Sequence, residues 1–346
     1  MTDPTPDRLA IHLSSDGTMA DRLELAQYAE ENGFDRVWRG ETRLTQSAVV
    51  ELTAYAAVTD EIELAAGVLP MWTRNVALMA QTWSTLYEFA GPRVGLGLGA
   101  WWEPLASKVG VDRRRPLRAM WEYSTVVRRL LDLENVTYDG DVVRVEDVEL
   151  DLLHDDPEPR AVPLYVGATG PQMNEMAGEL VGEGIVDGVF MNYMVPPEYT
   201  EWVVDRQRAG VEDSGGTIDE VDRPQLIGVS MADDRAVALD RARDLVTQYV
   251  AQQPHIREFS GIDGETADEI ESIVGGWPAS AADVERARHL VGDEVISDVL
   301  AVGTPDDVLE GVRKYCEAGC TEPALFTLEG TDPRDVMDLF ADRWPP

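Results

Sequence analysis

Residues 62–68 read Ile-Glu-Leu-Ala-Ala-Gly-Val, and residues 93–98 read Arg-Val-Gly-Leu-Gly-Leu. Both stretches are almost continuously apolar, which is typical of strands that are buried on both faces of a parallel sheet. The segment between them carries apolar residues at the period of a helix, at Val76, Met79, Ala80, Trp83, Leu86 and Tyr87. The three segments therefore predict a strand–helix–strand unit with parallel strands.

The same pattern recurs along the chain and predicts strands at residues 9–14, 35–38, 62–68, 93–98, 163–167, 185–191, 225–231 and 323–328. Helices separate them, one beginning at Thr18 with Asp21 as its capping partner, and a later one at Thr304 with Asp307. Eight strands that alternate with helices predict an α/β fold, a (β/α)8 TIM barrel, with an open doubly wound sheet as the alternative. We expect one domain over residues 1–346, with insertions after strands 4 and 7, at about 100–162 and 232–322, because these gaps exceed one crossover helix.

The charge of the chain restricts its partners. It has 65 Asp and Glu against 29 Lys and Arg, a formal net charge of −36, and its lysines are Lys108 and Lys314. Such a surface repels phosphate and excludes non-specific nucleic-acid binding. The pattern resembles proteins of a salt-loaded cytoplasm, as in halophilic archaea, where a Debye length of about 3 Å screens the repulsion. No run approaches roughly 18 apolar residues and no signal sequence is present, so we expect a cytoplasmic protein without membrane contact.

Tryptophans follow three neighbouring strands of the predicted barrel. Trp38 ends the second strand, Trp72 follows the third, and Trp101 and Trp102 follow the fourth. Because active sites of TIM barrels lie at the carboxyl ends of the strands, the four predict an aromatic wall for a planar or apolar ligand. Packing between loops is the alternative for any single tryptophan. We assign these residues and Asn75, which follows the third strand, to the substrate pocket.

The fourth strand alternates glycine with aliphatic residues. A period of two places Gly95, Gly97 and Gly99 on one face, where a flat ring or a neighbouring backbone can approach closely. The alternative is that these glycines make room for bulky residues inside the barrel.

The fifth strand leads into a loop of small residues. The loop consists of Gly167, Ala168, Thr169, Gly170, Pro171 and Gln172. Pro171 suits the first turn of a helix, whose free N–H groups and positive dipole end bind phosphate. The loop predicts an anion site, with an ordinary strand-to-helix turn as the alternative.

Metal chemistry has little support. The histidines, His12, His154, His255 and His289, are never paired at ligand spacing. Cys316 and Cys320 form only a weak candidate pair, so we expect no metal site. His12 ends the first strand, where it either faces the barrel mouth or is a satisfied buried histidine.

Several stretches together resemble the bacterial luciferase-like (β/α)8 oxidoreductases. They are residues 25–41, 62–75, 91–100, 163–168 and 303–308, which follow the family's order over most of the chain. The loop at residues 167–172 and the pair Ala177-Gly178 most resemble the branch that uses the deazaflavin coenzyme F420, typified by methylenetetrahydromethanopterin reductase. That branch implies a two-electron hydride carrier instead of an oxygen-activating flavin, and a homodimer.

The resemblance also implies which residues bind the coenzyme. A non-prolyl cis peptide matching Gly67-Val68 forms a bulge behind the deazaflavin ring, the acid after the second strand matches Glu41, and a polar contact matches Asn192. The full set is Glu41, Thr42, Gly67, Val68, Gly99, Ala100, Gly167, Ala168, Thr169, Gly170, Pro171, Gln172 and Asn192. Many relatives have His in place of Thr42 and Gly in place of Trp101, and these departures bear on the substrate.

The coenzyme has an anionic phosphate and glutamyl tail, so its binding to this acidic chain is expected to strengthen as salt is raised. Arg43, Arg74 and Arg160 are candidates for direct contacts with the tail, because arginine binds phosphate through two parallel hydrogen bonds.

We therefore predict an F420-dependent oxidoreductase that transfers a hydride between the coenzyme and an unidentified small organic substrate. Glu41 and Glu103 are the candidates for the accompanying proton transfer, and a salt bridge to Arg43 or a helix cap is the alternative role of Glu41. An FMN-dependent monooxygenase and a non-catalytic ligand-binding relative are the alternative functions.

Overall fold

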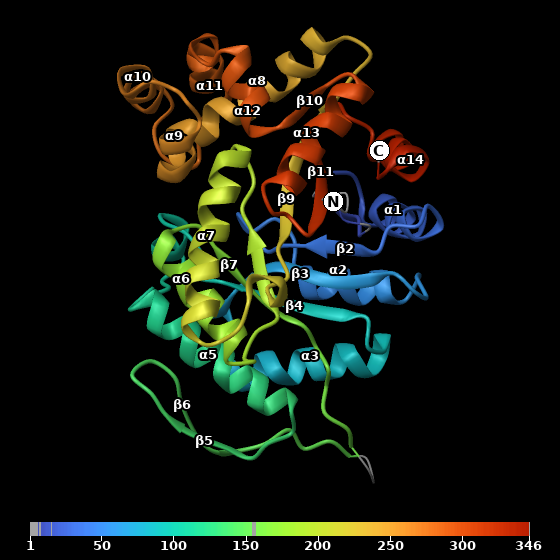
Figure 1. Cartoon of the computed structure of the whole chain (residues 1–346), viewed down its shortest axis with the longest axis vertical. Helices are drawn as coiled ribbons and strands as arrows, with labels where there is room; N and C mark the ends of the chain where they lie inside the picture. Colours follow the sequence, from blue (N-terminus) through green and yellow to red (C-terminus); the bar gives the residue numbers. More distant parts are fainter. Residues whose placement is uncertain (1–5, 7, 15, 154–156, 346) are drawn as a thin grey trace.

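Parallel strands close into a ring in the computed structural model, which describes residue 6 and residues 8–14, 16–153 and 157–345 (Figure 1). The eight strands of the ring are β1 (Ala10–His12), β2 (Arg36–Arg39), β3 (Glu63–Pro70), β4 (Val94–Gly99), β7 (Leu164–Ala168), β8 (Gly188–Met191), β9 (Pro224–Met231) and β11 (Glu322–Thr327). Each pairs with the next in chain order, and the ring closes because β11 pairs with β1. The predicted TIM barrel is confirmed, and the open sheet is wrong. His154 lies outside the described residues.

Helices connect the strands in the predicted alternation. They are α1 (Met19–Glu31), α2 (Ala48–Ala56), α3 (Val76–Ala90), α5 (Pro116–Leu131), α6 (Pro171–Gly182), α7 (Pro197–Asp213), α8 (Arg235–Gln252), α13 (Pro305–Glu317) and α14 (Pro333–Arg343). Reciprocal capping bonds between Thr18 and Asp21 start α1, and those between Thr304 and Asp307 start α13, as predicted. Within the described residues, no helix is long and apolar enough to cross a membrane.

The two long connections hold additional elements. Between β4 and β7 these are α4 (Leu105–Lys108), β5 (Val136–Asp139) and β6 (Arg144–Val148). Between β9 and β11 they are α9 (Pro254–Phe259), α10 (Gly264–Val274), α11 (Ala281–Ala287), the 3-10 turn Arg288–Leu290, α12 (Asp293–Val299) and β10 (Ala301–Gly303). Another 3-10 turn, Ile218–Glu220, lies between α7 and β9. A further 3-10 turn, Met71–Thr73, follows β3. Figure 1 shows the β5–β6 hairpin apart from the barrel and α8 to α12 gathered at the top of the view.

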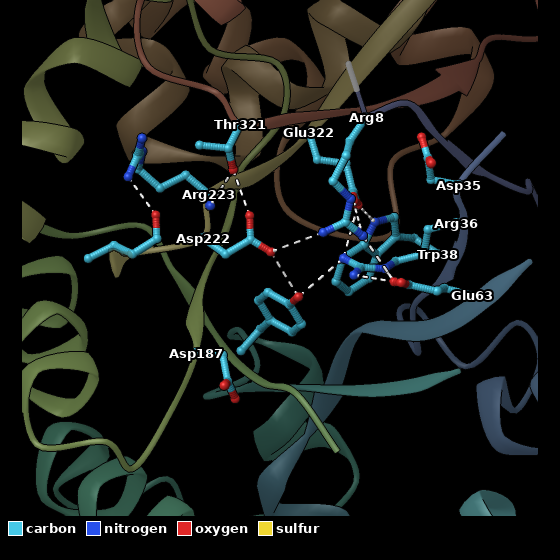
Figure 2. Close-up of polar contacts among 12 residues, drawn as sticks. Arg8, Asp35, Arg36, Trp38, Glu63, Asp187, Asp222, Arg223, Thr321 and Glu322 are labelled. Carbon is cyan, nitrogen blue, oxygen red and sulfur yellow. Dashed lines mark hydrogen bonds and ion pairs between the residues drawn. The ribbon is translucent and has the colours of Figure 1, made fainter. Parts of the chain in front are cut away.

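A network of charged side chains, in which Arg36 and Glu322 are buried, joins the amino-terminal ends of three strands (Figure 2). The guanidinium of Arg36, on β2, forms ion pairs with Glu63 of β3 and with Glu322 of β11, where Nη1 lies 3.1 Å from Oε1. The Trp38 indole N–H donates to the same Glu322 oxygen at 2.7 Å. Burial raises the pKa of Glu322, and the charges of Arg36 and Arg8 partly oppose that shift. The network joins β2, β3 and β11 at the end of the barrel opposite the candidate site.

Candidate functional site

The third strand bulges at the mouth of the barrel. Its register with β4 shifts between Ala66 and Leu69, and the Gly67-Val68 peptide is cis, as the family resemblance implied. The Glu41 N–H donates to the carbonyl oxygen of Val68 at 3.1 Å. Gly67 and Val68 are partly exposed although the residues on either side of them are buried. The bulge therefore faces the open end of the ring.

The glycines of β4 make room for this bulge. A Cβ at Gly97 would lie 2.3 Å from the carbonyl oxygen of Ala66, and one at Gly99 would lie 2.6 Å from Cγ2 of Val68. On the neighbouring strand, a Cβ at Gly167 would lie 3.0 Å from Cγ1 of Val68. The backbone of β3 thus approaches Gly97 closely, as the glycine spacing predicted, and the Val68 side chain fills the space beside Gly99 and Gly167.

Trp38 lies beneath the bulge, not above it. A Cβ at Gly67 would come within 2.8 Å of both the Trp38 and the Phe190 rings. Trp38 is fully buried, with its ring centre 5.2 Å from that of Tyr165 and 4.5 Å from that of Phe190. The prediction that Trp38 contacts the substrate is wrong, because its position on β2 directs the side chain into the barrel interior.

Glu41 accepts hydrogen bonds from two neighbouring loops. Arg74 donates to both carboxylate oxygens at 2.9 Å, and Ser47 Oγ and the Ala48 N–H donate to Oε1 at 3.0 and 3.2 Å. These bonds raise the pKa of Arg74. Glu41 therefore caps the start of α2, one of its two alternative roles, whereas its salt bridge is to Arg74 and not to Arg43. The carboxylate holds the β2–α2 loop against the β3–α3 loop.

A cavity of about 320 Å³ lies between these two loops. It is lined by Glu41, Thr42, Leu44, Thr45, Gln46, Ser47, Pro70, Thr73, Arg74 and Trp101. Three predicted site residues, Glu41, Thr42 and Trp101, are thus brought together. The indole N–H of Trp101 is buried and has no acceptor among the described residues. The bulge and the loop at residues 167–172 do not line this cavity.

Two other tryptophans of the predicted wall carry local contacts. The Trp72 indole N–H donates to the Ala100 carbonyl oxygen at 2.9 Å. The Trp102 ring meets Trp277 edge-on, with ring centres 5.4 Å apart and planes at 85°. Trp277 lies between α10 and α11, so the long connection after β9 reaches the loop that follows β4.

Glu103 and Asn75 both act as helix caps. The Glu103 carboxylate accepts from the Ser107 N–H at 3.2 Å, and its hydrogen bonds to Ser107 lower its pKa. Asn75 Oδ1 accepts from the Ala77 N–H at 2.9 Å at the start of α3. Neither residue lines the cavity around Glu41. The lowered pKa also means that Glu103 does not hold a proton near neutral pH, which weakens its predicted role as a proton donor.

The loop after β7 presents the free end of a helix. Gly170 is the N-cap of α6, Pro171 occupies its first turn, and no acidic residue is present in that turn. A Cβ at Gly170 would meet nothing within 4 Å, so the space beside the helix start is open. The first N–H groups of a helix have no acceptor within it and are therefore available to an anion at the helix start.

Asn192 connects the barrel to the long connection after β9. Its side-chain amide nitrogen lies 2.6 Å from Nε2 of His255 on α9, and the Gln225 side-chain amide donates to the backbone carbonyl oxygen of Asn192 at 3.1 Å. Burial lowers the pKa of His255 to about 4, so the neutral ring accepts the amide N–H at Nε2. His12 is also buried, with a pKa lowered to about 3 by burial and by Arg39, and its Nδ1 has no partner among the described residues.

The three candidate arginines have separate environments. Arg74 is held by Glu41, as described, and Arg43 packs on the rings of Trp102 and Tyr249. Arg160 lies over the ring of Tyr87 and donates to Ser84 Oγ at 3.2 Å. Because α3 runs back from the mouth, these partners in its second half place Arg160 toward the other end of the barrel. The prediction of a coenzyme contact for Arg160 is wrong.

Tyr249, His255 and Trp277 reach the mouth from the long connection after β9. The sequence does not predict these contacts, because each joins residues more than 60 positions apart and no local motif marks them. The β5–β6 hairpin did carry a signal, the Asp139-Gly140 turn between alternating segments.

Comparison with known proteins identifies relatives along nearly the whole chain. A model of the family described as luciferase-like monooxygenase matches residues 5–322. The 5,10-methylenetetrahydromethanopterin reductase of Methanolobus tindarius is 31% identical over 321 residues, 92% of this chain and 94% of that protein. The F420-dependent glucose-6-phosphate dehydrogenase of Kineococcus radiotolerans is 30% identical over 342 residues, 94% of this chain and 91% of that protein. The structure of the coenzyme F420-dependent tetrahydromethanopterin reductase of Methanopyrus kandleri matches with a TM-score of 0.83 at 25% identity, over 96% of this chain and 97% of that one.

Proposed function

Because the chain belongs to the luciferase-like monooxygenase family, we propose that it is a coenzyme F420-dependent oxidoreductase that passes a hydride to or from a small organic substrate. The observation that carries the proposal is its likeness, over 94% of its length, to a relative named for F420. A monooxygenase structure with a TM-score of 0.70 is only 20% identical to the chain and shows the fold alone.

The residues at the mouth fit both parts of such a coenzyme. Val68 and the glycines around it offer a surface with few side chains, on which a planar ring can lie. The start of α6 offers free N–H groups beside Gly170, with no acidic residue in its first turn. In a chain with 65 Asp and Glu, that first turn leaves the positive end of the helix dipole available to a phosphate.

The bound deazaflavin supplies a carbon that gives or takes a hydride. In the proposal Val68 supports one face of the ring, so that the substrate approaches the other face at a controlled distance. Glu41 is a positioning residue, because its oxygens already accept four hydrogen bonds. Trp101 donates its otherwise unpaired indole N–H to the ligand in the adjoining cavity.

The N-cap of α6 gives a direct test. Gly170 has φ −95° and ψ 162°, which any residue adopts, and aspartate is a favoured N-cap, so Gly170→Asp is expected to fold normally. Its carboxylate would repel the coenzyme phosphate, and F420 affinity should fall about tenfold or more. Gly170→Asn, which has the same shape without the charge, should retain affinity. Titration of coenzyme fluorescence in molar KCl measures both, and equal affinities would contradict the phosphate site.

Turnover assays separate the alternative functions. Oxygen-dependent turnover with reduced FMN would favour a monooxygenase, and tight ligand binding without turnover on either cofactor would favour a non-catalytic relative.

We also propose that the chain works as a homodimer in a salt-rich cytoplasm. Light scattering in molar KCl tests the dimer, and the mass of a single chain would contradict it.

A further inference from the structure

Aromatic rings hold the Arg43 side chain at the barrel mouth. Its guanidinium carbon lies 5.8 Å from the ring centre of Trp102 and 5.0 Å from that of Tyr249, and the residue is partly buried. Arg43 and Leu44 have φ of 52° and 57°, in the left-handed region that non-glycine residues rarely adopt. Two consecutive residues in this conformation give the loop an uncommon path, and such backbone is frequent at functional sites.

The Arg43 side chain also reaches toward the opposite side of the ring. Tyr249, on α8, accepts a hydrogen bond from the hydroxyl of Tyr193, which follows β8. Arg43 follows β2, and β2 and β8 lie four strands apart in either direction around the ring. Trp102 follows β4. The guanidinium is therefore held at the barrel mouth by Trp102 and by Tyr249, which is itself bonded to Tyr193.

The guanidinium itself has no polar partner among the residues that the structure describes. In the part of the chain that the structure describes, Arg43 forms neither an ion pair nor a hydrogen bond. Its neighbour in the fold, Arg74, is by contrast paired with Glu41. A guanidinium has five N–H donors, and stacking on rings leaves those at its edge free for a bidentate acceptor. The guanidinium nitrogens are not buried from solvent, so an incoming anion can reach them.

We propose that Arg43 is the subsite for an anionic group of the organic substrate, a carboxylate or a phosphate. The inference rests on the proposed function, which assigns the start of α6 to the coenzyme phosphate and so leaves Arg43 for the second molecule. The two anion sites follow β7 and β2, three strands apart around the ring. The substrate class is a small organic acid or phosphate ester whose uncharged part contacts the aromatic rings beside Arg43.

Inorganic phosphate is the probe for this subsite. It is titrated into the full-length protein saturated with F420 at constant salt, and phosphorus NMR line width gives the dissociation constant. Arg43→Met keeps the apolar stem, Arg43→Lys keeps the charge, and Arg206→Met removes an exposed arginine of α7 as the control for net charge. We expect Arg43→Met to weaken phosphate binding about tenfold or more, Arg43→Lys to weaken it less, and Arg206→Met to leave it unchanged. F420 affinity should stay within about twofold in all variants.

Three results would overturn the proposal: no phosphate binding by the wild type, equal phosphate affinity in Arg43→Met, or a parallel loss of F420 affinity in that variant. The last would assign Arg43 to the coenzyme tail. The failure of the proposed function looks different. In that case the wild type binds no F420, yet phosphate still binds through Arg43 when Gly170→Asp blocks the start of α6, and the anion subsite stands.

Discussion

Replacing Gly97 with alanine tests whether the glycine face of β4 holds the bulge in position. The new Cβ would lie 2.3 Å from the Ala66 carbonyl oxygen and 2.9 Å from Cγ1 of Val68. Real Cβ atoms essentially never approach other atoms closer than 3.0 Å, so β3 and β4 must separate by about 0.7 Å at this point. The carbonyl is backbone and cannot turn away as a flexible side chain would. The displacement therefore passes to Val68.

The expected size of the effect follows from that displacement. Overpacking of this kind lowers the free energy of unfolding by about 1–3 kcal/mol. Misplacing a bound reactant by on the order of 1 Å costs about 100-fold in rate. A shift of Val68 by a large part of that distance should lower both F420 affinity and turnover about tenfold or more, under conditions in which the variant remains folded.

Urea unfolding followed by tryptophan fluorescence measures the stability of the variant, and fluorescence titration of F420 in molar KCl measures its affinity. Gly264→Ala is the matched control, because a Cβ there meets nothing within 4 Å and alanine suits the start of α10. The control should keep wild-type stability and affinity. A Gly97→Ala protein that is destabilised as expected yet binds F420 like the wild type would refute the reasoning, because the bulge would then not support the ring.

Three further predictions concern charge. Coenzyme affinity should rise from low to molar KCl, because salt screens the repulsion between the acidic chain and the anionic tail, and weaker binding at every step would contradict this. Burial lowers the pKa of His12 to about 3 and of His255 to about 4, so below the ordinary value of 6.5 the native state binds fewer protons than the unfolded state. The free energy of unfolding should therefore fall as the pH drops from 6.5 toward 4, by up to about 1.4 kcal/mol per pH unit for each histidine. Urea unfolding of the double variant His12→Gln, His255→Gln should show a flatter slope, and an unchanged slope would exclude these groups. Arg36→Met leaves the Glu322 carboxylate inside the barrel with the partly exposed Arg8 and should lower the free energy of unfolding by about 3–5 kcal/mol, whereas a loss under about 1 kcal/mol would show that Arg8 suffices.

The barrel could be predicted because most of its strands can be recognised from a short stretch of sequence. Short runs rich in apolar residues mark the strands of the ring, although β2 begins and ends with arginine, and the Thr18 and Thr304 caps mark helix starts within four residues of sequence. The three-residue strand β10 (Ala301–Gly303) was not predicted, because its apolar residues directly continue those at the end of α12. Its pairing with the end of β9 depends on tertiary packing.

The sequence predicts those features of the candidate site that are formed by the main chain, but not the contacts between side chains. The bulge at Gly67-Val68 and the helix start at Gly170 follow from local sequence and family resemblance. Side-chain partners do not, since Glu41 binds Arg74 across 33 residues although Arg43 is nearer in sequence. Trp38 was assignable to the mouth by its place in the chain, but the direction of its side chain depends on strand register, which places it in the core.

The identity of the bound cofactor tests the central claim most directly. The purified full-length chain, in molar KCl, is titrated separately with oxidised F420 and with FMN, and each dissociation constant and stoichiometry is measured by fluorescence. The proposed function predicts saturable binding of one F420 per chain and no binding of FMN at the same concentrations. Saturable binding of FMN with none of F420 would contradict it and leave only the barrel and its family.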